Sequence, residues 1–127
     1  MGMAGFLATV LICDDEPALR ELVRVSLGDA YEIVEADNGD ACLKAARIHR
    51  PDLIVLDLMM PQRHGLDVLD DMRGDGDLAD TPVIVLTAQP SAGDDALRRG
   101  ATRVLEKPFD PDHINAAVEE VLTERRD

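Results

Sequence analysis

The chain has 127 residues and is 46% hydrophobic, which is enough for one folded domain with a real core and excludes general disorder. Its formal net charge is −13, so its electrostatic field repels the phosphates of nucleic acids and of anionic membranes. We therefore expect this chain alone to bind neither nucleic acid nor membrane, and we expect it to favour metal ions and cationic partners. No segment reaches membrane-spanning length, so we expect a soluble, cytoplasmic protein.

Strand-like and helix-like segments alternate along the sequence. In chain order, the patterns predict a strand over 8–13, a helix from Pro17 that Gly28 ends, a strand over 31–36, a helix over 40–49, a strand over 53–57, a helix over 65–73, a strand over 82–87, a helix over 94–100, a strand over 103–106 and a final helix that Asp110 caps. Such alternation predicts a doubly wound α/β fold, in which helices cover both faces of a parallel sheet. We expect residues 1–127 to form a single domain with a core over about 8–122.

The two cysteines, Cys13 and Cys42, have no spacing typical of a metal site. Cys13 lies on a predicted buried strand and Cys42 on a predicted helix. We expect both to be small core residues rather than partners in a disulfide bond.

Polar residues stand at the carboxyl ends of four predicted strands. They are Asp14-Asp15, Asp57, Thr87 and, just after the last strand, Lys107. Ligands bind at the carboxyl ends of the strands in open parallel sheets, so these side chains are predicted to converge on one edge. Each close pair of carboxylates there costs about 4 kcal/mol at a surface-like dielectric, and a bound cation would relieve that cost.

The converging residue types suit a divalent cation and a phosphoryl group. Mg²⁺ prefers oxygen ligands and often uses one or two carboxylates together with phosphate. We expect Asp15 and Asp57 as direct ligands, Asp14 close by or acting through water, and the backbone carbonyl of Met59 to complete the set. Lys107 would supply a positive charge to a phosphoryl oxygen, and Pro108 is a candidate for a cis peptide bond that would fix the aim of Lys107.

With these residues in place, the sequence resembles the receiver domains of two-component response regulators, from about Ala8 to Leu122. The motifs that carry the resemblance are Asp14-Asp15 with Pro17, Asp57 with Met60-Pro61 and Gly65, Thr87-Ala88, Gly100-Ala101 and Lys107-Pro108-Phe109. The resemblance implies a flavodoxin-like, five-stranded parallel sheet of strand order 2-1-3-4-5 with five helices.

The resemblance also implies a role for each site residue. Asp57 would be the phosphoacceptor, Thr87 and Lys107 would contact the phosphoryl group, and Asp14, Asp15, Asp57 and the Met59 carbonyl would hold Mg²⁺. The phosphoryl donor would be a sensor histidine kinase or a histidine phosphotransfer protein. The signal would pass to an effector protein, to an attached output domain or through a homodimer. The chain would catalyse only its own phosphorylation and dephosphorylation, either as a stand-alone regulator or as part of a longer protein.

The sequence departs from the receiver pattern in two places. Val104 stands where the family usually has Tyr or Phe, an aromatic residue that changes rotamer as the Thr is drawn to the phosphoryl group. The stretch from Thr87 to Gly100 contains Pro90 and Gly93 and looks shorter than usual, so we expect a short or irregular fourth helix. Signal output is therefore expected to be muted or to follow another route.

Two other functions compete with a phosphorylation switch. A haloacid dehalogenase-like phosphatase also uses an aspartate nucleophile and Mg²⁺, but it needs a second aspartate where this chain has Met59, and the chain has no room for a cap domain. A degenerate receiver-like module would bind partners without being phosphorylated. The histidines, His49, His64 and His113, lack metal-like spacing and are expected to be solvated.

Overall fold

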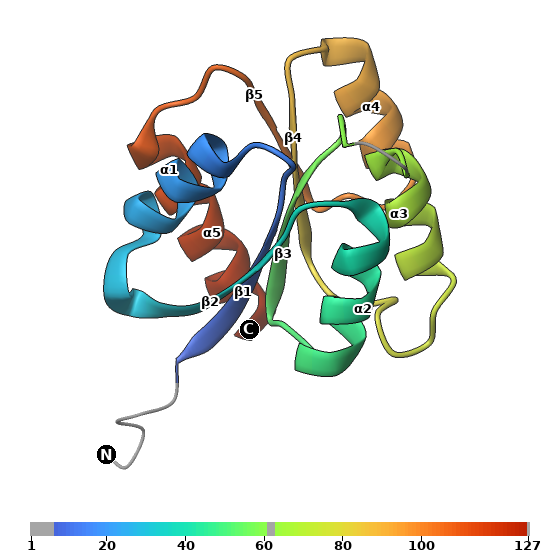
Figure 1. Cartoon of the computed structure of the whole chain (residues 1–127), viewed down its shortest axis with the longest axis horizontal. Coiled ribbons are helices and arrows are strands. Elements are labelled where there is room, and N and C mark those ends of the chain that lie inside the picture. The colour runs from blue at the N-terminus through green and yellow to red at the C-terminus, as the bar shows by residue number, and fades with distance from the viewer. Residues whose placement is uncertain (1–6, 61–62, 127) are drawn as a thin grey trace.

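Five parallel strands and five α-helices alternate along the part of the chain that the computed structural model describes, residues 7–60 and 63–126 (Figure 1). The elements are β1 (Ala8–Cys13), α1 (Pro17–Leu27), a single 3₁₀ turn η1 (Gly28–Ala30), β2 (Tyr31–Ala36), α2 (Gly39–His49), β3 (Leu53–Asp57), α3 (Gly65–Arg73), β4 (Val83–Thr87), α4 (Pro90–Arg98), β5 (Arg103–Glu106) and α5 (Pro111–Arg126). The sheet order is β2-β1-β3-β4-β5, so the predicted flavodoxin-like fold is confirmed.

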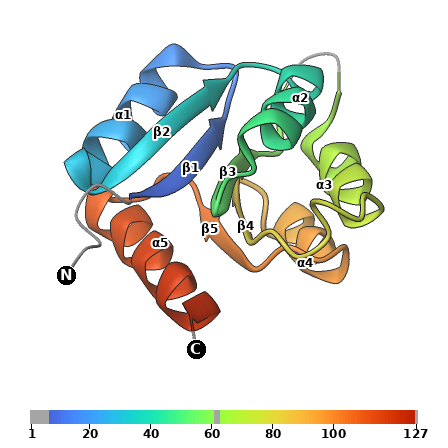
Figure 2. The ribbon, with the colours of Figure 1, turned by 90° about the horizontal axis from the view of Figure 1, so that it is seen from below.

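The helices form a layer on each side of the sheet. Helices α1 and α5 cover one face, and α2, α3 and α4 cover the other (Figures 1 and 2). Each face has its own hydrophobic core, because successive strand residues such as Val10 and Leu11 point to opposite sides. Every residue of the central strands β3 and β4 is buried, which explains their unbroken apolar sequences. Within the described ranges, no helix combines the length and the apolar character that crossing a lipid bilayer requires.

Helix α4 begins at Pro90, four residues before the predicted start, and ends at Arg98. The sequence analysis expected a short or irregular fourth helix, and α4 is nine residues long, as short as α3, with both Pro90 and Gly93 inside it. Proline suits the first turn of a helix because an amide there has no partner within the helix to lose. The carbonyl of Gln89 accepts the amides of Ala92 and Gly93 and so starts the helix.

The two cysteines are joined in a disulfide bond, so the prediction that they are unpaired is wrong. Both are fully buried, as expected of core residues. Cys13 ends β1 and Cys42 lies in the first part of α2, and the fold brings their Cα atoms to 5.9 Å from each other. Their 29-residue separation along the chain gives no sign of this proximity, which depends on how α2 packs against β1.

Arg73 ties together the loops at the amino edge of the sheet. Its Nη1 donates hydrogen bonds to the carbonyls of Leu78, Ala79 and Thr81, and its Nε and Nη2 both donate to the carbonyl of Gly100. Gly100 has a φ of 106°, and a Cβ at that position would lie 2.9 Å from Arg73 Nε. Glycine is therefore required here both for the backbone conformation and for the close approach of the guanidinium group.

Replacing Arg73 with lysine is expected to lower the free energy of unfolding by about 2–4 kcal/mol, because an ammonium group cannot reach four separated carbonyls and leaves buried acceptors unpaired. Urea denaturation measures the effect. Arg98→Lys is the matched control, since Arg98 is exposed and makes one ion pair, to Asp95 at 3.7 Å. That variant is expected to change stability by less than about 0.5 kcal/mol. Equal stability of the two variants would contradict the role of Arg73.

Candidate phosphoacceptor and metal site

The predicted site residues lie along the carboxyl edge of the sheet, the upper edge in Figure 1. Asp57 closes β3, Thr87 closes β4, and Lys107 follows β5 directly. Asp14 and Asp15 begin the loop that follows β1. The register places Asp57 opposite Leu86 and Thr87 opposite Glu106, so the strands end at nearly the same level. The structure therefore brings together the polar residues that the sequence analysis selected.

Asp57 is held by contacts to both of its carboxylate oxygens. The Nζ of Lys107 donates to Oδ2 at 2.8 Å, and the backbone amide of Met59 donates to Oδ1 at 3.0 Å. Asp57 is 1% exposed and the Lys107 side chain is 23% exposed, so the ion pair is shielded from most of the solvent. The Lys107–Pro108 peptide bond is cis, as predicted.

Thr87 is buried beside this pair and is linked to Lys107 through the backbone. The Lys107 amide donates to the Thr87 carbonyl at 2.9 Å. The Thr87 hydroxyl oxygen accepts the amide of Gln89 at 3.1 Å, so the hydroxyl proton is left to donate to another acceptor. Thr87 can thus offer a hydrogen bond to an oxyanion while its own oxygen is held in place.

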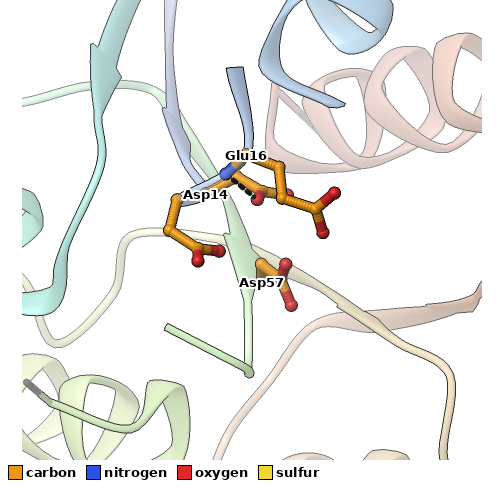
Figure 3. A group of neighbouring side chains, drawn as sticks. Asp14, Glu16 and Asp57 are labelled. Atoms are coloured by element: carbon orange, nitrogen blue, oxygen red, sulfur yellow. Dashed lines mark hydrogen bonds between the residues drawn. The ribbon is translucent and has the colours of Figure 1, made fainter. Parts of the chain in front are cut away.

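Four carboxylates, not the predicted three, cluster at this edge. One oxygen from each of Asp14, Asp15, Glu16 and Asp57 lies within 4.8 Å of the others. Asp57 faces Asp14 and Glu16 across the end of the sheet (Figure 3). The sequence analysis did not select Glu16, although it directly follows the acidic pair, because the Pro17 that comes next suggested only the start of a helix.

The environment of the Asp14 carboxylate is the clearest sign of a cation-binding site. It is 1% exposed, its Oδ1 accepts the Glu16 amide at 2.9 Å, and its Oδ2 has no hydrogen-bond partner among the described residues. Burial, together with the nearby Asp57 carboxylate, raises the pKa of Asp14 to about 7. A buried carboxylate oxygen without a donor, facing other carboxylates, is an environment that a bound divalent ion would satisfy.

Arg20 fixes the backbone of the acidic turn. Its Nη1 donates to the Asp14 carbonyl at 2.7 Å, and its Nε donates to Glu35 Oε1 on β2 at 3.0 Å. The sequence analysis missed Arg20, since nothing in the spacing indicates that an α1 side chain turns back over the end of β1.

The remaining residues that the sequence analysis discussed lie at the margin of the site or outside it. Met59 is exposed beside Asp57, and its carbonyl remains a predicted ligand. Pro61, part of the receiver-like motif, lies outside the described residues. His49, His64 and His113 are exposed, as expected. The Nδ1 of His64 accepts the Leu66 amide and so caps α3.

Val104 packs against α4 at the one glycine within that helix. A Cβ on Gly93 would lie 2.9 Å from Val104 Cγ1 and 3.6 Å from Thr87 Cγ2. The absence of a side chain at Gly93 therefore allows α4 to approach both β4 and β5. Thr87, Gly93 and Val104 form a contact between the candidate phosphoryl site and the outer helix.

Comparison with known proteins defines the class. The family model described as "Response regulator receiver domain" matches residues 10–119. The response regulator MprA of Mycobacterium tuberculosis is 40% identical over 120 residues, which cover 92% of this chain and 48% of that protein. A putative response regulator from Chloroflexus aurantiacus superposes with a TM-score of 0.88 at 29% identity, covering 93% of this chain and 99% of that one. Chemotaxis response regulator CheY4 of Vibrio cholerae superposes with a TM-score of 0.85 at 31% sequence identity, and the match covers 91% of this chain and 99% of that one.

The chain belongs to the response regulator receiver domain family, which confirms the resemblance seen in the sequence. It is thus a receiver domain of two-component response regulators, a class that signals through phosphorylation. The chain spans about half the length of the curated relatives it matches.

Replacing Asp14 with asparagine is expected to stabilise the protein in EDTA at pH 8. The folded-state pKa of Asp14, about 7, exceeds the usual 3.8, so the ionised carboxylate opposes folding. This penalty is absent below about pH 4, grows as pH rises and is complete above pH 7. In thermal unfolding, the free energy of unfolding of the variant should therefore exceed that of the wild type by about 2–4 kcal/mol at pH 8, and by less at pH 5. A gap that is the same at both pH values would contradict the burial argument.

Gly93→Ala is expected to destabilise the wild type by about 1 kcal/mol, because the clash with Val104 outweighs the better helix propensity of alanine. In a Val104→Ala background the clash is removed, and the same change at Gly93 should be neutral or stabilising. A double-mutant cycle in urea measures the coupling between the two positions. Additive effects would show that α4 and β5 do not press on each other at this point.

Proposed function

We propose that this chain is a phosphorylation-controlled signalling switch in which Asp57 accepts a phosphoryl group in a Mg²⁺-dependent reaction. The observation that carries the proposal is the Lys107 ammonium group at 2.8 Å from a buried Asp57 carboxylate, at the edge where three further carboxylates gather. A lone ion pair has many structural uses. A nucleophilic carboxylate combined with a cation, a hydroxyl donor and an acidic cluster matches the needs of phosphoryl transfer.

The donor in this proposal is a phosphohistidine on a sensor histidine kinase or a histidine phosphotransfer protein. A carboxylate oxygen of Asp57 attacks the phosphorus in line with the phosphorus–nitrogen bond. A new oxygen–phosphorus bond forms as the bond to nitrogen breaks, and the imidazole nitrogen keeps the electron pair and takes up a proton. The contacts of Asp57 to Met59 and Lys107 hold the carboxylate in one orientation before the attack.

The remaining site residues would stabilise the negative charge on the phosphoryl group during its transfer. Negative charge spreads over three phosphoryl oxygens. Lys107, which is bonded to Asp57, would neutralise part of this charge, and the hydroxyl of Thr87 at the end of the neighbouring strand would donate a hydrogen bond to one of these oxygens. Asp14, Asp15, Asp57 and the Met59 carbonyl would hold Mg²⁺, which when bound offsets further charge on those oxygens. The unpartnered Oδ2 of Asp14 supports this ligand set.

The phosphorylated state is reversible, because an acyl phosphate is labile to water. Water attacks the phosphorus, releases inorganic phosphate and restores the Asp57 carboxylate. Met59 and Gln89 are both exposed beside the site and would shape the access of that water. In this proposal the chain catalyses only its own phosphorylation and dephosphorylation and turns over no other substrate.

The receiver unit is proposed to comprise about residues 8–122 of a single domain and to act in the cytoplasm. Its output passes to an effector protein, an attached output domain or a second copy of the chain. MprA and the other curated relatives are about twice as long as this chain, which leaves the identity of the output segment to experiment. With a net charge of −13, the chain itself is not expected to bind nucleic acid or membrane.

Incubation with acetyl phosphate and MgCl₂ is expected to add one phosphoryl group to the wild type, detected by intact-mass spectrometry. Asp57→Asn should abolish the mass gain, because the nucleophile is lost. Asp29→Asn makes the same chemical change at an exposed residue by the amino end of β2 and should leave labelling unchanged. Lys107→Ala should slow labelling by about 100-fold, the typical effect of losing one group that stabilises a transition state.

Three other outcomes would overturn the proposal. A wild type that binds Mg²⁺ but gains no mass would indicate a degenerate module that only binds partners. Rapid multiple turnover of diverse phosphoesters would indicate a phosphatase. Labelling that persists in Asp57→Asn would place the acceptor on another residue.

A further inference from the structure

Glu16 occupies a position that the receiver mechanism above does not use. Its carboxylate belongs to the group of four whose oxygens lie within 4.8 Å of one another, and it is exposed. Glu16 is also the N-cap residue of α1, but its side chain makes no capping hydrogen bond. Among the ion pairs formed by residues 7–60 and 63–126, none involves Glu16. The carboxylate therefore has neither a helix-capping role nor an ion-pairing role.

The charge balance at the carboxyl edge is unfavourable for such a residue. Four carboxylates meet there, and the ion pair that reaches the cluster is the one from Lys107 to Asp57. A solvated glutamate would normally turn away from like charges, since each close pair is repulsive. A Glu16 oxygen nevertheless lies within 4.8 Å of an oxygen of Asp14 and of Asp57, and Figure 3 shows these three side chains together at the end of β3.

A second observation, the missing hydrogen-bond partner of one buried oxygen, points to a ligand. The Oδ2 of Asp14 is buried and has no hydrogen-bond donor among the described residues. The Glu16 amide is bonded to the other oxygen, Oδ1, so the turn that brings Glu16 to the cluster also leaves Oδ2 unpaired. A divalent cation would satisfy the Asp14 oxygen and relieve the repulsion on Glu16 at the same time.

A surface hollow adjoins Glu16. The hollow is lined by Glu16, Leu19 and Leu22 of the α1 region and by Lys107 and Phe109 of the segment after β5. Glu16 is the acidic residue among those that line the hollow, and Lys107, which is bonded to Asp57, lines it as well. A hydrated Mg²⁺ ion retains several waters, so Glu16 can reach it either directly or through one of them.

We propose that Glu16 is an additional anionic ligand of the divalent-cation site, which raises the affinity of the unphosphorylated domain for Mg²⁺. This inference rests on the proposed function, because it assumes that the cluster binds Mg²⁺. It assigns to the third acidic residue of the β1–α1 turn a role that neither the motif nor the family match provides. Its effect is local, so it differs from the general attraction of cations by a chain of charge −13.

Isothermal titration of MgCl₂ into the metal-free, unphosphorylated protein tests the proposal. Glu16→Gln is expected to raise the dissociation constant for Mg²⁺ by about fivefold to tenfold, as removal of a carboxylate close to the ion should. Glu32→Gln removes the same charge from an exposed residue of the edge strand β2 and should change the constant by less than about twofold. Glu16→Asp keeps the charge and shortens the reach, so its constant should fall between those of wild type and Glu16→Gln.

The outcomes separate this inference from the proposed function. Asp15→Asn, which removes a predicted direct ligand, should nearly abolish binding and so shows that the titration reports this site. Equal dissociation constants for Glu16→Gln and Glu32→Gln, with wild type binding Mg²⁺ and Asp57 still labelled by acetyl phosphate, would overturn the role of Glu16 alone. Tighter binding by Glu16→Gln would also overturn it. Loss of both Mg²⁺ binding and labelling in the wild type would overturn the proposed function itself.

Discussion

The contact between the Lys107 ammonium group and the Asp57 carboxylate depends on the whole sheet. The two residues are 50 positions apart, and β4 lies between the strands that carry them. Their side chains meet only because β3, β4 and β5 run parallel and end at the same level. A shift of one residue in either pairing would turn alternate side chains to the opposite face and separate the pair. Strand register is therefore the constraint on which the candidate chemistry rests.

The same edge carries a cost to stability that the rest of the fold has to offset. Asp14 and Asp57 are almost completely buried, and the pKa of Asp14 is raised mainly because burial disfavours its charged form. The fold tolerates this cost because β3 and β4 are buried along their whole length and the loops at the opposite edge are tied by Arg73. The repulsion between carboxylates is thus confined to the carboxyl edge, where the Lys107–Asp57 ion pair offsets part of it.

The contact between the candidate site and α4 runs through Val104, at a position where the receiver pattern usually has an aromatic residue. Thr87 and Val104 both approach Gly93, so a movement of Thr87 would press on α4 through a small, stiff contact. Valine has a single side-chain torsion that its branching restricts, whereas an aromatic ring can swing between two well-separated positions. Val104 therefore has less rotamer freedom at this contact than the aromatic residue that the receiver pattern usually has there. Arg103 of β5 donates hydrogen bonds to Glu120 and Glu124 of α5, while Val104 of the same strand packs against α4.

The sequence by itself determined the α/β class, the strand order through the family resemblance, and which five polar residues, Asp14, Asp15, Asp57, Thr87 and Lys107, meet at one edge of the sheet. Apolar periodicity and polar residues at strand ends are local signals, which is why they can be read without the structure. It located most elements to within a residue, but it placed the start of α4 late, since Pro90 is a breaker within a helix and a favoured residue at its first turn. Only the tertiary structure decided that Cys13 is bonded to Cys42 and that Arg20 and Glu16 join the acidic turn. These are contacts between residues whose proximity depends on how a helix or turn packs against the sheet, and spacing along the chain does not encode that packing.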